Sequence, residues 1–126
     1  MRLYSLVGPL LLASVVTFAQ DKSPTEIPSI IYLQYLNQNA PQWMCQQDAT
    51  FSCLGIPAMV CVKGVEAAAE RCGPALLAQW PTSFPETREN ALEYSAQYRQ
   101  CILEDWITQQ WITPEQLNQC EPNNSL

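Results

Sequence analysis

The chain is short, acidic and free of histidine, with 126 residues and a formal net charge of −6 at pH 7. Nucleic acids and anionic membranes require a basic surface, so neither is an expected partner. Without histidine there is no Ser-His-Asp triad, no Cys-His pair and no imidazole ligand for a metal ion. We therefore expect no nucleic-acid partner, no cofactor and no metal site.

The first residues have the pattern of an export signal. Arg2 supplies a positive charge, residues 3–16 form an apolar stretch, and residues 17–19 suit a signal peptidase. The apolar stretch is shorter than the roughly 20 residues that cross a bilayer, and the polar C-terminus has no hydrophobic tail for a lipid anchor. We predict a signal peptide over residues 1–19 and a single secreted domain over residues 20–126, without a membrane span. The bacterial periplasm is the alternative location.

All six cysteines lie in the predicted secreted domain: Cys45, Cys53, Cys61, Cys72, Cys101 and Cys120. An even number of cysteines in a short exported chain predicts three disulfides, each worth about 2–4 kcal/mol of stability. The sequence does not choose among the possible pairings. Zinc sites use cysteine pairs with two to four residues between them, whereas the closest cysteines here have seven, which argues against zinc.

Helix-forming residues and helical spacing of apolar residues predict an all-α domain, a small disulfide-stapled bundle of four or five short helices. In chain order, we expect helical segments near residues 28–36, 46–54, 58–62, 65–72 and 75–80, a long helix up to about 110, and a short helix after Thr113. There is no alternating apolar run and no hairpin turn sequence, so no strand is expected.

Prolines, glycines and capping residues set the expected helix ends. Residues 37–41 end the first segment, residues 55–57 separate the next two, and Gly73 with Pro74 is expected to stop the clearest helix. The sequence from Ser83 to Glu86 has the form of a capping box, and the sequence from Thr113 to Gln116 repeats it with proline at the first helical position.

Three groups of acidic side chains are candidate catalytic carboxylates: Glu66/Glu70, Glu104/Asp105 and Glu86/Glu89/Glu93. A glycosidase needs two carboxylates about 5–9 Å apart across a cleft, a spacing that Glu66 and Glu70 can meet on one helix face. Solvated helix faces explain all three groups more simply. We expect that the chain is not an enzyme.

Aromatic side chains are the candidate binding residues. Trp80 precedes Pro81 in an expected loop, and loops lie at the surface, so we predict Trp80 as a binding anchor, with Phe84 beside it. Four other aromatic residues are expected to fill the core: Trp43, Tyr94, Tyr98 and Trp106. Asn123 begins an Asn-Asn-Ser sequon and is a possible glycosylation site.

Several short motifs resemble a group of fungal small secreted cysteine-rich proteins. They are Trp43 to Gln47, Cys53, then Cys72-Gly73-Pro74 with Leu76, and Tyr94 before Cys101, so the resemblance covers about residues 43–101. This chain departs from the pattern, because Met44 is inserted between Trp43 and Cys45 and a Cys-x-Cys step is missing near Trp80. The resemblance implies secretion and no particular activity.

These observations lead to a secreted, non-enzymatic protein that acts by binding a protein or cell-wall partner, as an effector-like protein does. Two alternatives stay open. One is a carrier of a small apolar ligand between helices. The other is a carboxylate-dependent hydrolase that uses Glu66 or Glu70.

Overall fold

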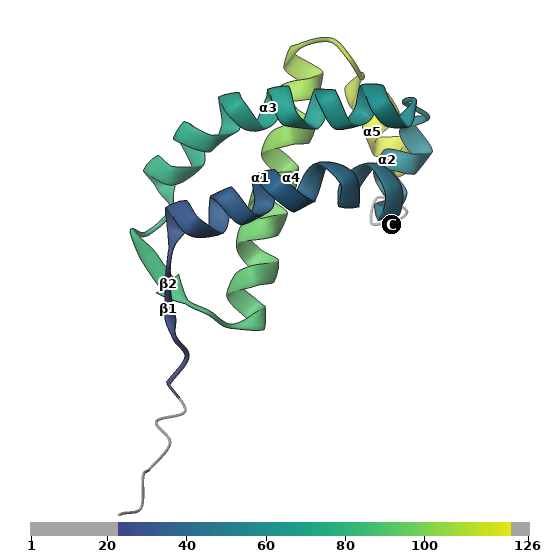
Figure 1. Ribbon diagram of the computed structural model, residues 1–126. Coiled ribbons are helices and arrows are strands. Elements are labelled where there is room, and N and C mark those ends of the chain that lie inside the picture. Colours follow the sequence, from purple (N-terminus) through teal and green to yellow (C-terminus); the bar gives the residue numbers. More distant parts are fainter. Residues whose placement is uncertain (1–22, 122–126) are drawn as a thin grey trace, which may run out of the picture.

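The computed structural model describes residues 23–121, and these residues are mostly helical, as predicted (Figure 1). The predicted leader over residues 1–19 and the sequon at Asn123 lie outside the described residues. The described elements follow in chain order: β1 (Glu26–Pro28), α1 (Ser29–Gln47), α2 (Ala49–Leu54), α3 (Ala58–Gln79), β2 (Ser83–Pro85), α4 (Arg88–Thr108) and α5 (Pro114–Cys120).

Helices α1 and α3 lie side by side and run in opposite directions, while α4 crosses behind both of them (Figure 1). The short helices α2 and α5 pack together at the end where α1 leads into α3. The strands β1 and β2 form a small ribbon at the other end. The second half of α4 lies against α3, and its first half extends below α1 toward the ribbon.

The predicted helix stop at Gly73 and Pro74 is wrong, because α3 continues through both residues to Gln79. A proline disfavours the helical conformation of the residue before it, in part through a clash with the Cβ atom of that residue, and Gly73 has no Cβ atom. Gly73 is also buried, and a Cβ atom there would lie 3.4 Å from Cδ2 of Leu33. The same two residues that predicted a stop therefore allow a continuous helix packed against α1.

Pro41 is likewise inside α1, so the predicted end of the first helical segment is also wrong. Pro41 is buried together with Ala40 and Met44, and this tertiary packing holds the helix through the proline. The predicted break at residues 55–57 is confirmed, since Gly55 ends α2 with a left-handed φ of 71°.

The absence of strands was a wrong expectation. Glu26–Pro28 and Ser83–Pro85 pair antiparallel, with Ile27 opposite Phe84. Strands of three residues give no alternating pattern, and partners this distant in sequence give no turn signal.

The capping box expected at Ser83 is absent as well, because Ser83 lies in β2. Instead, Thr87 caps α4 by accepting a hydrogen bond from the backbone N–H of Asn90 at 3.1 Å. The capping box at Thr113 is confirmed.

All six cysteines form disulfides, and each bond joins two helices. Cys45–Cys61 joins α1 to α3, Cys72–Cys101 joins α3 to α4, and Cys53–Cys120 joins α2 to α5. The three predicted disulfides are confirmed, and their pairing shows that every helix is cross-linked to a spatial neighbour.

The core lies where α4 crosses α3. Tyr98 and Trp106 are fully buried there, as predicted. The indole N–H of Trp106 donates to the carbonyl oxygen of Gly64 at 3.1 Å, and a Cβ atom on Gly64 would lie 2.5 Å from the ring of Trp111. Only glycine at position 64 allows this close contact between α3 and the two indole rings. Elsewhere in the core, the Tyr98 hydroxyl donates to Oδ1 of Asn37 at 2.9 Å, which links α4 to α1.

Removing the Cys53–Cys120 bond by replacing both residues with alanine should release α5 while the rest of the fold remains, because α2 is the main neighbour of α5. Hydrogen exchange should accelerate at least tenfold over Pro114–Cys120 and stay unchanged in α3 and α4. In contrast, the Cys72→Ala/Cys101→Ala variant should lose about 2–4 kcal/mol of global stability. Equal loss of protection throughout both variants would contradict this division.

Stability should fall at high pH because burial raises the pKa of Tyr98 to about 12. The unfolded chain loses the phenol proton near pH 10 and the folded chain only near pH 12, so the free energy of unfolding should fall by up to about 1.4 kcal/mol per pH unit in this window. Urea unfolding from pH 9 to 11.5 measures this slope. Tyr98→Phe should make it shallower. An unchanged slope would show that Tyr98 does not titrate as its burial requires.

Candidate binding groove

Three large apolar side chains form a row along the exposed side of α1. Ile31, Tyr35 and Trp43 follow the four-residue spacing that aligns residues on one helix face, with Asn39 completing the row. Their exposed fractions are 49%, 57% and 48%. The row spans about 18 Å, given a rise of 1.5 Å per residue. No Asp, Glu, Lys or Arg occurs in the 19 residues of α1, so this surface is uncharged.

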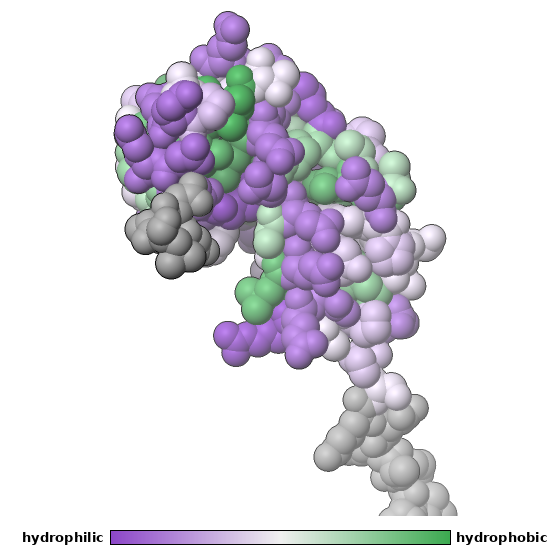
Figure 2. Space-filling view, turned by 180° about the vertical axis from the view of Figure 1, so that it is seen from behind, coloured by the Kyte–Doolittle hydropathy of each residue, from purple (hydrophilic) through white to green (hydrophobic). Residues whose placement is uncertain are grey.

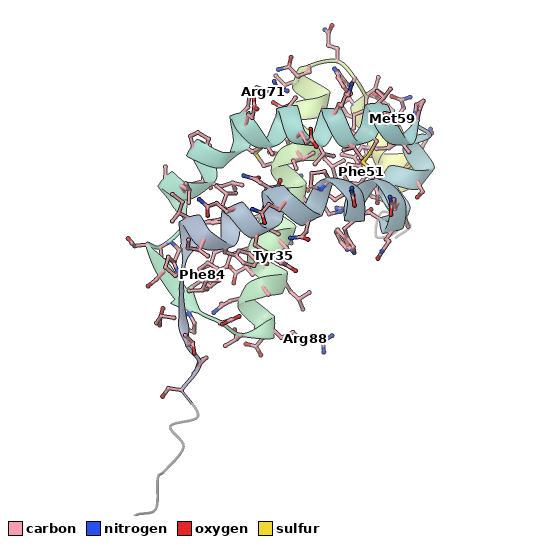
Figure 3. The ribbon with its side chains drawn as sticks, in the orientation of Figure 1. Tyr35, Phe51, Met59, Arg71, Phe84 and Arg88 are labelled. Carbon is pink, nitrogen blue, oxygen red and sulfur yellow. A yellow bond between two sulfur atoms is a disulfide. The ribbon has the colours of Figure 1, made fainter. Side chains whose placement is uncertain are left out.

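This row forms one wall of a groove of about 590 Å³. The first half of α4 forms the opposite wall through Ala91, Leu92 and Ser95, and Leu92 is 60% exposed. Buried residues of α1 form the floor: Tyr32, Leu36, Ala40 and Met44. Figure 3 shows Tyr35 and Phe84 in the angle between α1 and the first half of α4. Figure 2, seen from behind, shows a hollow with hydrophobic surface at its edge, on a face where hydrophilic and hydrophobic patches are mixed.

The β-ribbon closes one end of the groove. Ile27 and Phe84 are direct partners in the ribbon, and partner side chains lie on the same face of a ribbon. Phe84 packs edge-on against Tyr32 at 5.3 Å between ring centroids and stacks on Tyr94 at 4.3 Å. Glu86 follows Phe84 by two residues and lines the same end. The ribbon therefore brings one carboxylate to an otherwise apolar groove.

Three polar side chains of the groove each use a donor within the protein. The Tyr32 hydroxyl donates to the Ala91 carbonyl at 2.8 Å, and Nδ2 of Asn39 donates to the Tyr35 carbonyl at 2.9 Å. Ser95 donates to the Leu92 carbonyl at 3.1 Å. Burial raises the pKa of Tyr32, which keeps its hydroxyl neutral. The groove thus offers apolar surface and few free hydrogen-bond donors.

The prediction that Trp80 is exposed is wrong, because only 6% of Trp80 is exposed. Its indole N–H donates to Oε1 of Gln97 at 2.8 Å, and its ring packs edge-on against Tyr94 at 5.1 Å. Pairing of β2 with β1 folds the expected loop back onto the helices, which a sequence reading cannot show. We therefore do not retain Trp80 as a binding anchor. Phe84 is also buried, but it reaches the groove as part of its lining.

Trp43 was expected in the core, and the structure places it half-exposed on the groove wall. The sequence did not show that the first helix continues through Pro41. Once α1 is known to continue through Pro41, the spacing of Ile31, Tyr35 and Trp43 aligns these residues on one side of it. Tyr94 is partly buried against Trp80 and Phe84, as a residue at the edge of the core.

Of the candidate carboxylates, Glu86 lines the groove and the others do not. Glu66 and Glu70 are exposed on α3, and Glu66 lines a shallow depression with Lys63 that Glu70 does not line. Asp105 instead accepts two hydrogen bonds from Arg71, at 2.7 and 2.8 Å. These positions match solvated helix faces and ion pairs, and they give no support to the hydrolase alternative.

Within residues 23–121, no cluster of three or more Cys, Asp and Glu side chains is arranged to hold a metal ion. None of the helices in that range is long and apolar enough to cross a membrane. No protein-family model, curated protein or solved structure matches the chain. The resemblance to fungal secreted cysteine-rich proteins stays a prediction.

Tryptophan fluorescence should report the exposure of the groove wall. In a Trp111→Phe variant, Trp43 should be the one indole within residues 23–121 that acrylamide quenches, since Trp80 and Trp106 are 6% and 1% exposed. A further Trp43→Phe change should remove the quenchable emission and leave the shielded emission in place. If all three remaining indoles in the first variant are shielded, the groove is not open as described.

Proposed function

We propose that this chain is a secreted, non-enzymatic binding protein that takes the apolar surface of a partner protein into the groove between α1 and α4. One observation carries the proposal. Four large hydrophobic side chains, Ile31, Tyr35, Trp43 and Leu92, remain about half-exposed around one groove. Exposed apolar surface gathered in this way marks interaction sites.

The chemistry of the groove favours a protein over a cell-wall polymer. Sugars present many hydroxyl groups, and burial of a polar group without a hydrogen-bond partner is costly. Tyr32, Asn39 and Ser95 each donate to a backbone carbonyl, so the groove has few polar groups left for the many hydroxyl groups of a sugar chain. Aromatic and aliphatic side chains together with few charges are typical of the centre of a protein interface.

The three disulfides fit an oxidising compartment, which supports the proposed secretion. The predicted leader over residues 1–19 and the resemblance to fungal secreted proteins favour the same location. An effector-like role outside the producing cell is consistent with a stable scaffold that presents one apolar binding surface.

A carrier of a small apolar ligand is the second candidate. The volume of about 590 Å³ falls within the range of about 300–1,000 Å³ that small-ligand pockets have. However, small-ligand sites enclose most of their ligand, whereas here the groove walls stay half-exposed over about 18 Å. A protein surface that covers both walls fits this geometry better.

Ile31→Lys should weaken retention of the native protein on extracellular protein fractions by at least about tenfold, because it places a charge where an apolar side chain is covered. Leu92→Lys should act in the same way from the opposite wall. Ile30→Lys is the matched control, since Ile30 is 53% exposed on the same helix and does not line the groove. Bound protein is quantified after washing, with each variant checked for native thermal stability.

Treatment of the fraction with a protease before binding should abolish retention, whereas digestion of its polysaccharides should not. The proposal fails if Ile31→Lys and Leu92→Lys bind as well as Ile30→Lys. Retention that survives the protease would point to a cell-wall polymer. A lipid recovered from the native protein by mass spectrometry, and lost in Ile31→Lys, would favour the carrier function.

A further inference from the structure

We infer that the partner segment in the groove is an amphipathic α-helix of about three turns, lying along α1 with a basic side chain beside Glu86. This inference rests on the proposed function and names the shape and charge of what binds. Three features of the groove carry it: the inclined row of large apolar side chains on α1, the hydrogen bonding of the groove, and the position of its one charged residue.

The row on α1 has the form of a helix-packing ridge. Residues four apart on a helix form continuous ridges, and a second helix packs by fitting its own ridges alongside them. Ile31, Tyr35 and Trp43 present such a ridge on α1, while other residues of the same helix pack against α3. Leu92 supports the other side of the groove from α4. A ridge of about 18 Å matches about 12 residues of a partner helix.

Hydrogen bonding distinguishes a helix from an extended peptide. The long walls of the groove are helices, and most of their backbone groups are already paired within α1 and α4. Tyr32, Asn39 and Ser95 each donate to a backbone carbonyl as well. The few polar groups that remain, such as the Tyr35 hydroxyl and the Trp43 indole N–H, cannot pair the whole backbone of a peptide. An extended peptide would bury backbone N–H and C=O groups without partners, at a cost of about 1–3 kcal/mol for each group. A helix satisfies these groups internally and presents only side chains.

Charge complementarity sets the sign of the partner. Among the described residues, Glu86 is the one charged side chain that lines the groove, and α1 adds no charge. Arg88 lies two residues later but does not line the groove, and Figure 3 shows it at the outer end of α4. The whole chain carries a net charge of −6. A basic side chain at this end of the partner helix is therefore favoured, and an acidic one is repelled.

Selection from two peptide libraries tests the inference. One library displays 14-residue segments on a stable helical scaffold, and the other displays unstructured 14-residue peptides. Both are selected on the native disulfide-bonded protein and depleted on the Ile31→Lys variant. We expect enrichment from the helical library alone, with apolar residues at i, i+3 or i+4, and i+7, and a net positive charge.

Affinity for the enriched helices is measured through the Trp43 emission in the Trp111→Phe background. Glu86→Gln should weaken binding about threefold to tenfold at low salt and have little effect at high salt, because salt screens an exposed charge pair. Glu89→Gln is the matched control, since Glu89 lies at the same end of α4 but does not line the groove.

The inference is overturned if extended or acidic sequences are enriched, if neither library yields a binder, or if Glu86→Gln and Glu89→Gln behave alike. None of these results affects the proposed function, which depends on the retention of the native protein and its sensitivity to Ile31→Lys. Loss of that sensitivity would instead remove both.

Discussion

Beside the ion pair of Arg71 with Asp105, two contacts in the core hold α4 across α3, and the rest of the molecule depends on them. At one, the absence of a side chain on Gly64 lets Trp106 donate to the backbone of α3. At the other, Cys72 is bonded to Cys101. Both contacts hold the middle and second half of α4, so its first half projects beyond α3. This projecting half forms an angle with α1, and that angle is the groove.

Local sequence signals predicted the helical class, the cap at Thr113 and the oxidation of all six cysteines, since each depends on neighbouring residues or on cysteine number. The predictions from local sequence were wrong at places where segments that are distant in sequence pack together. Gly73 and Pro74 predict a stop until Leu33 is known to pack against the glycine. Trp80 followed by Pro81 indicates a surface loop, and only the pairing of β2 with β1 shows that this segment folds back onto the helices. The groove was missed because it needs α1 to be continuous through Pro41 and α4 to lie opposite.

Helix α1 has no charged residue and presents apolar side chains both to the core and to the exposed side of the groove. One side packs against α3 and forms the groove floor, while the row of Ile31, Tyr35 and Trp43 faces outward. A helix that is apolar on both sides is unusual in a protein surface and is normally covered. The polar residue Asn39 does not change this character, because its side chain donates to the Tyr35 carbonyl of the same helix.

The bond from Cys45 to Cys61 lies two residues beyond Trp43 and ties that end of α1 to α3. This end of the groove wall is therefore held covalently, and a surface that is already held in place loses little conformational entropy on association. The same bond makes the anchoring of this wall depend on the redox state of the surroundings. A chain in a reducing environment would lack this cross-link, so the end of α1 that carries Trp43 would be held against α3 by packing alone.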